Sequence, residues 1–368
     1  MNKERNKKAG VSTLPVIFCL MLLLFLYADR AMEGVRRGLT LCTQTLFPSL
    51  FPFLILSGLL VKERAGDLLG RLLNRPVRAL LGLSEKGAVA LLLGMLCGFP
   101  VGMTTATAYC DSGDMSEQEL HRFLLFGNNP SPGFLIGAVG TALFGNGSLG
   151  VVLFLSVWLS ALIMGILFHI LWGKLPQMKQ NYEYGNEKNS FTAHLTTSVE
   201  KGFSSLLQIF SFVIFFSCMG ACLEPILQEL ALPNIAKIVI NGVLEMTLGT
   251  GLAAAGLSPS NALVLTAFFA GFGGLSVMLQ LFAVVRQYRP HALPYLLTKG
   301  LQGMLAAGLV KLYLVYAAPS LHITDCVSAF AQGLLPHPLS SGVLIGASLF
   351  FLVLLLCGRK KGASRARP

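Results

Sequence analysis

Charged residues are scarce in this chain of 368 residues. Asp, Glu, Lys and Arg together make up 12% of it, whereas 54% of the residues are hydrophobic. An ordinary soluble domain carries about 25% charged residues. The shortage of charge therefore argues against a soluble globular enzyme and indicates a polytopic membrane protein, whose spans are predominantly apolar.

Acidic residues are also fewer than basic ones, 17 against 28, which gives a net charge of +11. Such a balance can indicate nucleic-acid binding. Here the basic residues cluster beside apolar segments, which is the positive-inside pattern of membrane proteins. We therefore expect a lipid bilayer as partner and no nucleic acid.

Motifs of enzymes and of metal centres are missing. The sequence has no H-E-x-x-H, no G-x-S-x-G and no Walker A loop. Its eight cysteines form no C-x-x-C pair, and its six histidines are isolated. We expect a protein that is not an enzyme and has no metal site and no cofactor, while a coupling Na⁺ or H⁺ stays open.

The stretch at 121–144, HRFLLFGNNPSPGFLIGAVGTALF, is long and apolar enough to cross a bilayer. Its centre disfavours a helix, because Pro130 and Pro132 lack N–H donors and restrict the residues before them. We expect two half-helices, the second capped by Ser131. Unwound backbone inside a membrane needs buried protein or a water-filled cavity, and many transporters build substrate sites from it.

A second kind of interruption lies at 87–109, where GFPVG separates two arms of about ten residues. Such arms are too short to span, so we expect a re-entrant helical hairpin. The second half of the chain contains an interrupted apolar stretch at 236–257, with LEMTLGTG at its centre, and a glycine-broken span at 262–285.

The two halves also share a pattern before the hairpins. VRRGLTLCTQTLF at 35–47 resembles VEKGFSSLLQIFS at 199–211, although chance similarity of membrane segments is the alternative. At one constant offset the matches are Gly38 with Gly202, Thr40 with Ser204, and Gln44 with Gln208. We predict an all-α membrane protein with two repeats, each containing an amphipathic helix, a re-entrant hairpin and a broken helix.

Charge placement predicts the topology. With both termini in the cytoplasm, eight spans and two hairpins put the Lys- and Arg-bearing loops 62–86, 173–201, 286–299 and 359–368 inside. The loops 145–148, 223–236 and 319–339 fall outside and carry no Lys or Arg; only the turn 29–37 breaks the rule. The repeats are then inverted relative to each other.

The predicted organisation has five parts. They are a cytoplasmic tail with the first transmembrane helix (1–33), the first inverted repeat (34–172, hairpin about 87–109, broken helix about 120–145), a cytoplasmic loop (173–198), the second inverted repeat (199–290, hairpin about 236–257, broken helix about 262–285), and C-terminal transmembrane helices with a basic tail (291–368).

Glu245 is the most informative single residue, because a carboxylate at membrane depth is costly. It could bind a cation, relay a proton or accept a hydrogen bond from a substrate. Alternatively, it could only cap a half-helix. Lys311 either extends toward the interface or faces an anionic substrate. The residues predicted to bind substrate are Gly98, Pro100, Asn128, Asn129, Ser131, Glu245, Thr247, Gly273, Gly274, Ser276, Gln280 and Lys311.

Four motifs together resemble one family. They are CGFPVG at 97–102, NNPSPGFLIGAVG at 128–140, LEMTLG at 244–249 and FGGLSV at 272–277. In this order they resemble the sporulation integral membrane proteins of the YlbJ type, which belong to the wider group with nucleoside-recognition, or Gate, domains. The resemblance runs from about Gly34 to Tyr316. Gly127, where a hydroxyl residue is expected, and the acidic linker 110–119 depart from the pattern.

This resemblance implies an architecture like that of concentrative nucleoside transporters and a role in endospore formation. It implies dipicolinic acid as substrate and the outer forespore membrane as location. Half-helix N-termini suit the two carboxylates of dipicolinate, but Glu245 would oppose an anion unless it were protonated or bound to a cation. Nucleoside transport is therefore the second hypothesis, and a non-transporting spore-envelope assembly protein is the third. A homo-oligomer stays open.

Overall fold

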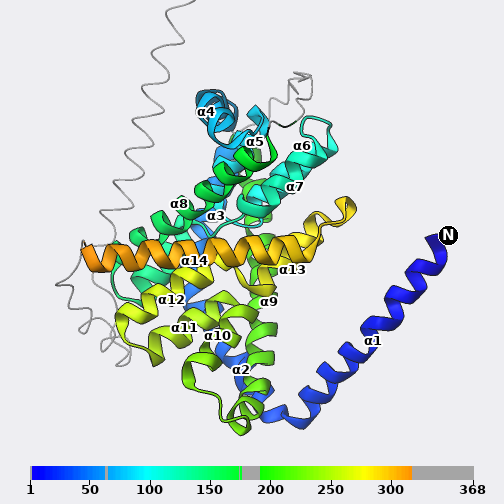
Figure 1. Ribbon diagram of the computed structural model, residues 1–368, viewed down its shortest axis with the longest axis vertical. Coiled ribbons are helices and arrows are strands. Elements are labelled where there is room, and N and C mark those ends of the chain that lie inside the picture. Colours follow the sequence, from blue (N-terminus) through cyan, green and yellow to red (C-terminus); the bar gives the residue numbers. More distant parts are fainter. Residues whose placement is uncertain (1, 63–64, 174, 176–190, 317–368) are drawn as a thin grey trace, which may run out of the picture.

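The computed structural model describes residues 2–62, 65–173, 175 and 191–316. Within these residues all regular secondary structure is helical (Figure 1). The elements up to residue 173 are α1 (Asn2–Leu26), α2 (Ala28–Leu41), a π-helical turn η1 (Cys42–Leu46), α3 (Phe47–Lys62), α4 (Ala65–Leu81), α5 (Glu85–Cys97), α6 (Val101–Asp111), α7 (Glu117–Phe126), a π-helix η2 (Gly133–Leu143) and α8 (Gly147–Trp172).

The elements from residue 191 onward are also helical. They are α9 (Phe191–Glu229), α10 (Asn234–Leu244), α11 (Met246–Gly256), α12 (Pro259–Phe272), α13 (Gly274–Val284), a 3₁₀ turn η3 (Arg286–Tyr288) and α14 (Ala292–Tyr316). Several predicted loops are therefore too long. The segment 62–86 contains α4, α9 begins at Phe191 within 173–198 and continues to Glu229 within 223–236, and α14 begins at Ala292 within 286–299.

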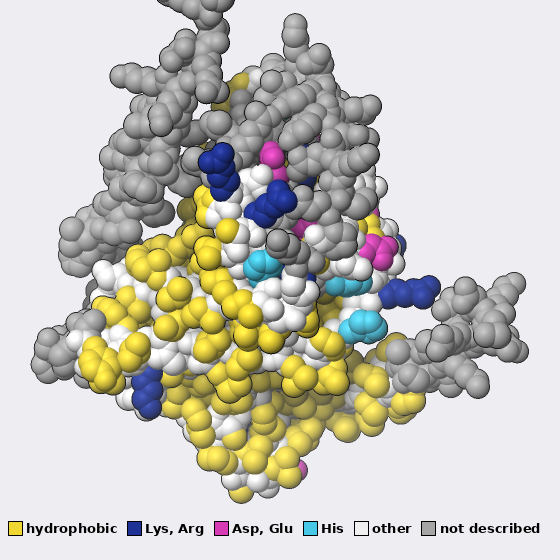
Figure 2. Space-filling view, turned by 45° about the horizontal axis from the view of Figure 1, so that its top comes forward, with side chains coloured by type: hydrophobic (Ala, Val, Ile, Leu, Met, Phe, Trp, Pro, Cys, Tyr) yellow, Lys and Arg dark blue, Asp and Glu magenta, His cyan; other side chains and the backbone are white. Residues whose placement is uncertain are grey.

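Several of the described helices are apolar enough to cross a membrane. By length and composition these are Ala28–Leu56, Gly147–Trp172, Phe191–Glu229 and Pro259–Val284, with a fifth if the bent pair Leu73–Leu81 and Glu85–Cys97 is one span. Apolar side chains cover much of the face in Figure 2, while charged side chains and histidines gather toward its upper part. The all-helical fold with several apolar helices is that of a polytopic membrane protein.

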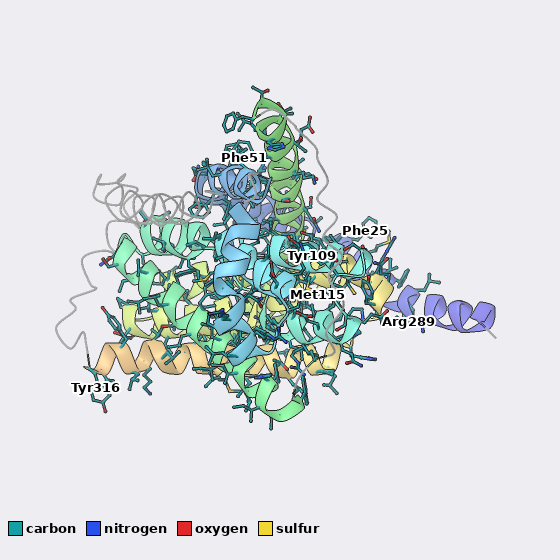
Figure 3. The ribbon with its side chains drawn as sticks, turned by 90° about the horizontal axis from the view of Figure 1, so that it is seen from above. Phe25, Phe51, Tyr109, Met115, Arg289 and Tyr316 are labelled. Atoms are coloured by element: carbon teal, nitrogen blue, oxygen red, sulfur yellow. The ribbon has the colours of Figure 1, made fainter. Side chains whose placement is uncertain are left out.

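The count of spans differs from the eight predicted. The first transmembrane helix, predicted within 1–33, corresponds to α1, and α14 falls in the C-terminal part 291–368; neither is among the four helices above. The rest of that C-terminal part, 317–368, lies outside the described residues. α1 projects from the body of the molecule, and α14 runs across it to end at Tyr316 (Figures 1 and 3).

The helices α2 and α3 pack along the long helix α9. Small residues permit the close approach: a Cβ on Gly34 would lie 2.7 Å from the Cα of Cys218. Ser217 Oγ donates to the Gly34 carbonyl oxygen over 2.9 Å. Farther along, Gly58 faces Ser198, so the two segments run in opposite directions. Close contact of small residues is the usual way in which helices associate in lipid.

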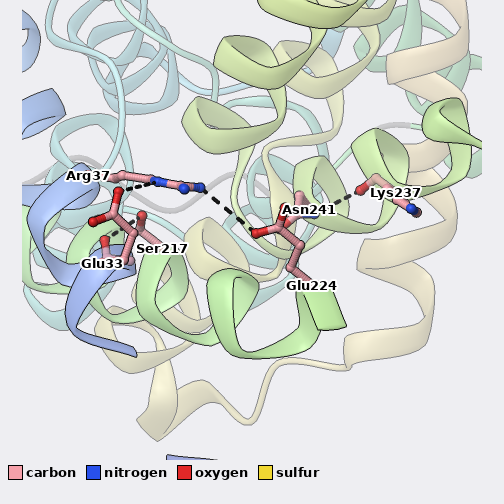
Figure 4. A network of polar contacts seen from close by, with 7 residues as sticks. Glu33, Arg37, Ser217, Glu224, Lys237 and Asn241 are labelled. Atoms are coloured by element: carbon pink, nitrogen blue, oxygen red, sulfur yellow. Dashed lines mark hydrogen bonds and ion pairs between the residues drawn. The ribbon is translucent and has the colours of Figure 1, made fainter. Parts of the chain in front are cut away.

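A polar cluster lies at one end of this interface (Figure 4). Arg37 lies between two carboxylates, with N–O distances of 2.9 Å to Glu33 and 4.0 Å to Glu224. All three side chains are substantially exposed. The segment 29–37, predicted as a turn, is part of α2, and acidic neighbours from α2 and α9 offset its Arg37.

Candidate functional site

The first helical hairpin is formed by α5 and α6. Ser84 begins α5, because its Oγ accepts from the Gly87 N–H at 3.1 Å. The arms approach closely, since a Cβ on Gly102 would lie 2.6 Å from the Cα of Gly94. The break at Gly98–Pro100 corresponds to the interruption expected within 87–109, with Pro100 at the start of α6.

The second hairpin is formed by α10 and α11, which break at Glu245. A Cβ on Gly249 would lie 2.1 Å from the Cα of Gly242, so glycine again allows the arms to touch. Glu245 is extended, and its side chain is 2% exposed. Its Oε2 accepts from the Leu248 N–H at 2.7 Å, and the carboxylate thus caps α11 at the positive end of the helix.

The first broken helix consists of α7, an unwound link at 127–132, and η2. The residues of the link satisfy its backbone groups locally. Asn129 Nδ2 donates to the Phe126 carbonyl oxygen over 2.7 Å, and Ser131 Oγ accepts from the Phe134 N–H at 3.2 Å. The N-cap role predicted for Ser131 is confirmed, whereas the π-helical form of η2 was not predicted.

The second broken helix consists of α12 and α13. It breaks at Gly273 and Gly274, whose φ angles are +86° and +80°, a region that favours glycine. On the first turn of α13, Ser276 Oγ accepts from Gln280 Nε2 at 3.3 Å. The amide oxygen of Gln280 is buried and has no hydrogen-bond partner among the described residues.

Each hairpin tip contacts the broken helix of its own half of the chain. A Cβ on Gly98 would lie 2.7 Å from the Ser131 backbone nitrogen. In the second half, a Cβ on Gly274 would lie 3.3 Å from the Met246 nitrogen and 3.4 Å from the Glu245 Cα. A glycine at each contact, at the hairpin tip in the first half and in the broken helix in the second, therefore allows two backbone breaks to lie against each other.

One pocket lies where these four breaks meet. Its polar lining comes from Ser131, Glu245, Thr247 and Gln280, all of which were predicted to bind substrate. The lining also includes Cys97, Phe99, Pro130, Phe134, Met246 and Val277, and an apolar wall from η1, α3 and α9 formed by Leu46, Leu50, Leu54, Ile209 and Val213. All four polar lining residues thus come from the hairpins and broken helices, whereas the lining from η1, α3 and α9 is entirely apolar.

The other predicted residues stand in different relations to the pocket. Three of them, Gly98, Gly274 and Ser276, contact residues that line the pocket. Pro100 follows the lining residue Phe99 in the chain, and Gly273 precedes Gly274. Asn128 and Asn129 are buried behind it. Lys311 is exposed on α14 and does not line the pocket, which suits the interfacial alternative rather than a role in binding an anion.

Sequence reasoning missed the buried cation of this region, Lys299. It was assigned to the loop 286–299, but α14 begins two turns earlier and carries it into the protein, where it is 1% exposed. Its Nζ donates to the Asn128 carbonyl oxygen over 2.9 Å. Gln302, one turn later on the same face of an apolar helix, was the available signal.

Comparison with known proteins gives one informative likeness. The chain is 27% identical over 350 residues to sporulation integral membrane protein YlbJ of Bacillus subtilis (strain 168), which covers 83% of this chain and 86% of that protein. No protein-family model matches the chain, and no solved structure matches it.

Proposed function

We propose that this chain, which belongs to the family of YlbJ-type sporulation integral membrane proteins, is a transporter and not an enzyme. The pocket at the meeting point of two hairpins and two broken helices carries the proposal. Unwound backbone inside a membrane protein is tolerated where it lines a cavity, and transporters use such a cavity as a solute site. A scaffold would gain nothing from it.

Contacts within the fold support a two-fold inverted repeat. Gly38 and Gly202, which match in sequence, both lie in the interface between α2–α3 and α9: Gly38 faces Ile214, and Gly202 faces Ile55. The tip-to-break contacts also occur once in each half. We propose that the two repeats move against each other and open the pocket alternately to the two sides, as in other inverted-repeat transporters.

The proposed substrate is dipicolinate, moved across the outer forespore membrane during endospore formation. The helix starts at α11, α13 and η2 lie at the breaks around the pocket, and positive helix ends favour carboxylates. Gln280 adds an amide that can rotate to donate to an anion. Because Glu245 also faces the pocket, we propose that it holds a proton or a coupling cation when the dianion binds.

A nucleoside is the second candidate substrate. The unpartnered Gln280 amide oxygen and the Glu245 carboxylate are both acceptors on the polar side of the pocket. Ribose hydroxyls are donors that such acceptors bind directly. The apolar wall from α3 and α9 would then contact the base.

Flux into vesicles tests the proposal and separates the two substrates. Purified protein is reconstituted into vesicles that contain Tb³⁺, whose luminescence rises when dipicolinate chelates it. We expect protein-dependent entry of dipicolinate that excess uridine does not slow. Uridine flux without dipicolinate flux would favour the nucleoside alternative, and flux of neither solute above that of protein-free vesicles would contradict transport.

A further inference from the structure

Lys299 forms a buried polar cluster that the proposed pocket does not use. Three oxygens surround its Nζ: the Asn128 carbonyl oxygen at 2.9 Å, Asn129 Oδ1 at 3.2 Å and Gln302 Oε1 at 2.8 Å. Gln302 Nε2 also donates to Asn129 Oδ1 over 2.6 Å. The ammonium thus has one acceptor for each of its three protons.

All three acceptors are neutral. The three hydrogen-bond acceptors described around Lys299 Nζ include no carboxylate. A buried cation usually has a carboxylate partner, because desolvation is costly. A shell of backbone and amide oxygens without a carboxylate is instead the environment that transporters offer to a monovalent metal ion.

The cluster lies on the unwound link of the first broken helix. Asn128 and Asn129 belong to that link, and the next two residues, Pro130 and Ser131, line the pocket. The charge on Lys299 therefore fixes the backbone directly behind the solute site. In a broken helix, unwound carbonyls at this place are the usual ligands of a coupling Na⁺.

We infer that Lys299 Nζ occupies a monovalent-cation site and replaces a diffusible metal ion there. The protein carries this cation covalently, on a helix packed against the broken span, so the link keeps its geometry whether or not Na⁺ is present. A coupling ion at Glu245 would be a separate site. The inference concerns the ion requirement of the proposed transporter, but its test needs no transport.

Removing the side chain of Lys299 should create a Na⁺ site. Lys299→Ala leaves the three oxygens and a space, so Na⁺ can enter, whereas Lys299→Met fills the space without charge. Lys311→Ala removes an exposed lysine from the same helix and is the matched control. The thermal unfolding midpoint of each purified protein is measured in NaCl and in choline chloride at equal ionic strength.

We expect Lys311→Ala to respond to Na⁺ as the wild type does, so any Na⁺ site elsewhere in the protein affects both equally. Lys299→Ala should be destabilised in choline and recover with Na⁺ in a saturable manner, by on the order of 5 °C. Lys299→Met should be destabilised in both salts alike. A folded Lys299→Ala protein without a Na⁺ response beyond that of the wild type would overturn the inference. A wild-type Na⁺ response that Lys299→Ala abolishes would also overturn it, because the metal ion would then bind at this cluster with Lys299 in place.

If Lys299→Ala fails to fold in either salt, a second variant decides. Lys299→Ala combined with Asn129→Asp supplies a carboxylate to the same oxygen shell, which strengthens Na⁺ binding. We expect folded protein in NaCl and little in choline chloride. Equal amounts in both salts, whether high or absent, would overturn the inference. Vesicles that show no solute flux would contradict the proposed function and leave this test unaffected.

Discussion

At the scale of single residues, Glu245 is placed where both the structural and the functional alternatives can be tested. It caps α11 through Leu248, and it also lines the pocket. Glu245→Gln keeps a carbonyl oxygen for the cap but removes the charge. We expect a folded protein that exchanges solute down its gradient but loses accumulation driven by a Na⁺ or H⁺ gradient.

Accumulation is measured in vesicles with each gradient imposed in turn, for the wild type and for Glu245→Gln. Glu245→Ala, which also removes the cap, should in addition lose about 1 kcal/mol of stability. Wild-type behaviour of Glu245→Gln under both gradients would limit Glu245 to its structural role.

Gln280 and Asn129 are both buried amides, but only Gln280 lines the pocket. Gln280→Leu should weaken solute binding and cost less stability than Asn129→Leu, because it loses only the bond from Nε2 to Ser276 Oγ (3.3 Å) and its amide oxygen has no partner to lose. Asn129→Leu should reduce flux and also cost roughly 1–3 kcal/mol, because Lys299, Gln302 and the Phe126 carbonyl lose a partner. Thermal unfolding and solute affinity of both variants are compared. Equal loss of stability in the two would contradict the assignment.

At the scale of helices, glycine contacts should control the packing of α2 on α9. A Cβ on Gly34 would lie 2.6 Å from the Ser217 carbonyl oxygen, which is backbone and cannot move aside alone. Gly34→Ala should therefore lower the unfolding temperature and the yield of folded protein. Gly300→Ala, in α14, has nothing within 4 Å and is the control.

The control should be neutral or slightly stabilising, by about 0.5–1 kcal/mol, because alanine favours a helix interior over glycine. Unfolding in detergent, followed by circular dichroism, provides the comparison. The same loss in both variants would show that the α2–α9 contact does not depend on Gly34.

The sequence was most informative at helix breaks. Proline and glycine have local effects on the backbone, so the interruptions near Gly98, Ser131 and Gly273 could be predicted. The residues at which helices begin within polar segments could not be predicted, because tertiary contacts determine them. Lys299 is an example, because its buried partners Asn128 and Asn129 lie about 170 residues away in the chain. From the local sequence alone, it is predicted to lie in a loop.

At the scale of the whole molecule, polar contacts join segments that are distant in the sequence. Ser84 N–H donates to Glu119 Oε1 over 2.7 Å, Arg122 Nη1 donates to the Gly173 carbonyl oxygen over 2.9 Å, and His121 Nε2 lies 2.8 Å from the Tyr288 carbonyl oxygen. Ser84, Gly173 and Tyr288 belong to three segments predicted to lie inside, so α7 contacts all three. Arg37 and Glu224 join two segments assigned to the outer side.

This grouping makes the topology testable at described positions. Ser148 and His291 are both exposed, in segments predicted to lie outside and inside respectively. A membrane-impermeant thiol reagent should label Ser148→Cys from outside intact cells and His291→Cys only after permeabilisation. The wild type, with its native cysteines, gives the background. Labelling of both from one side would contradict the inverted arrangement.

The central claim is that solute binds in the pocket between the two hairpins and the two broken helices. Val277 lines that pocket, so Val277→Cys in a Cys97→Ala background places a thiol beside the proposed solute. Modification of that thiol by a small reagent is followed by peptide mass spectrometry, with exposed Ser148→Cys as the control. We predict that dipicolinate slows modification at position 277 several-fold and leaves position 148 unchanged. Unaltered modification at 277 in protein that still moves dipicolinate would contradict the claim.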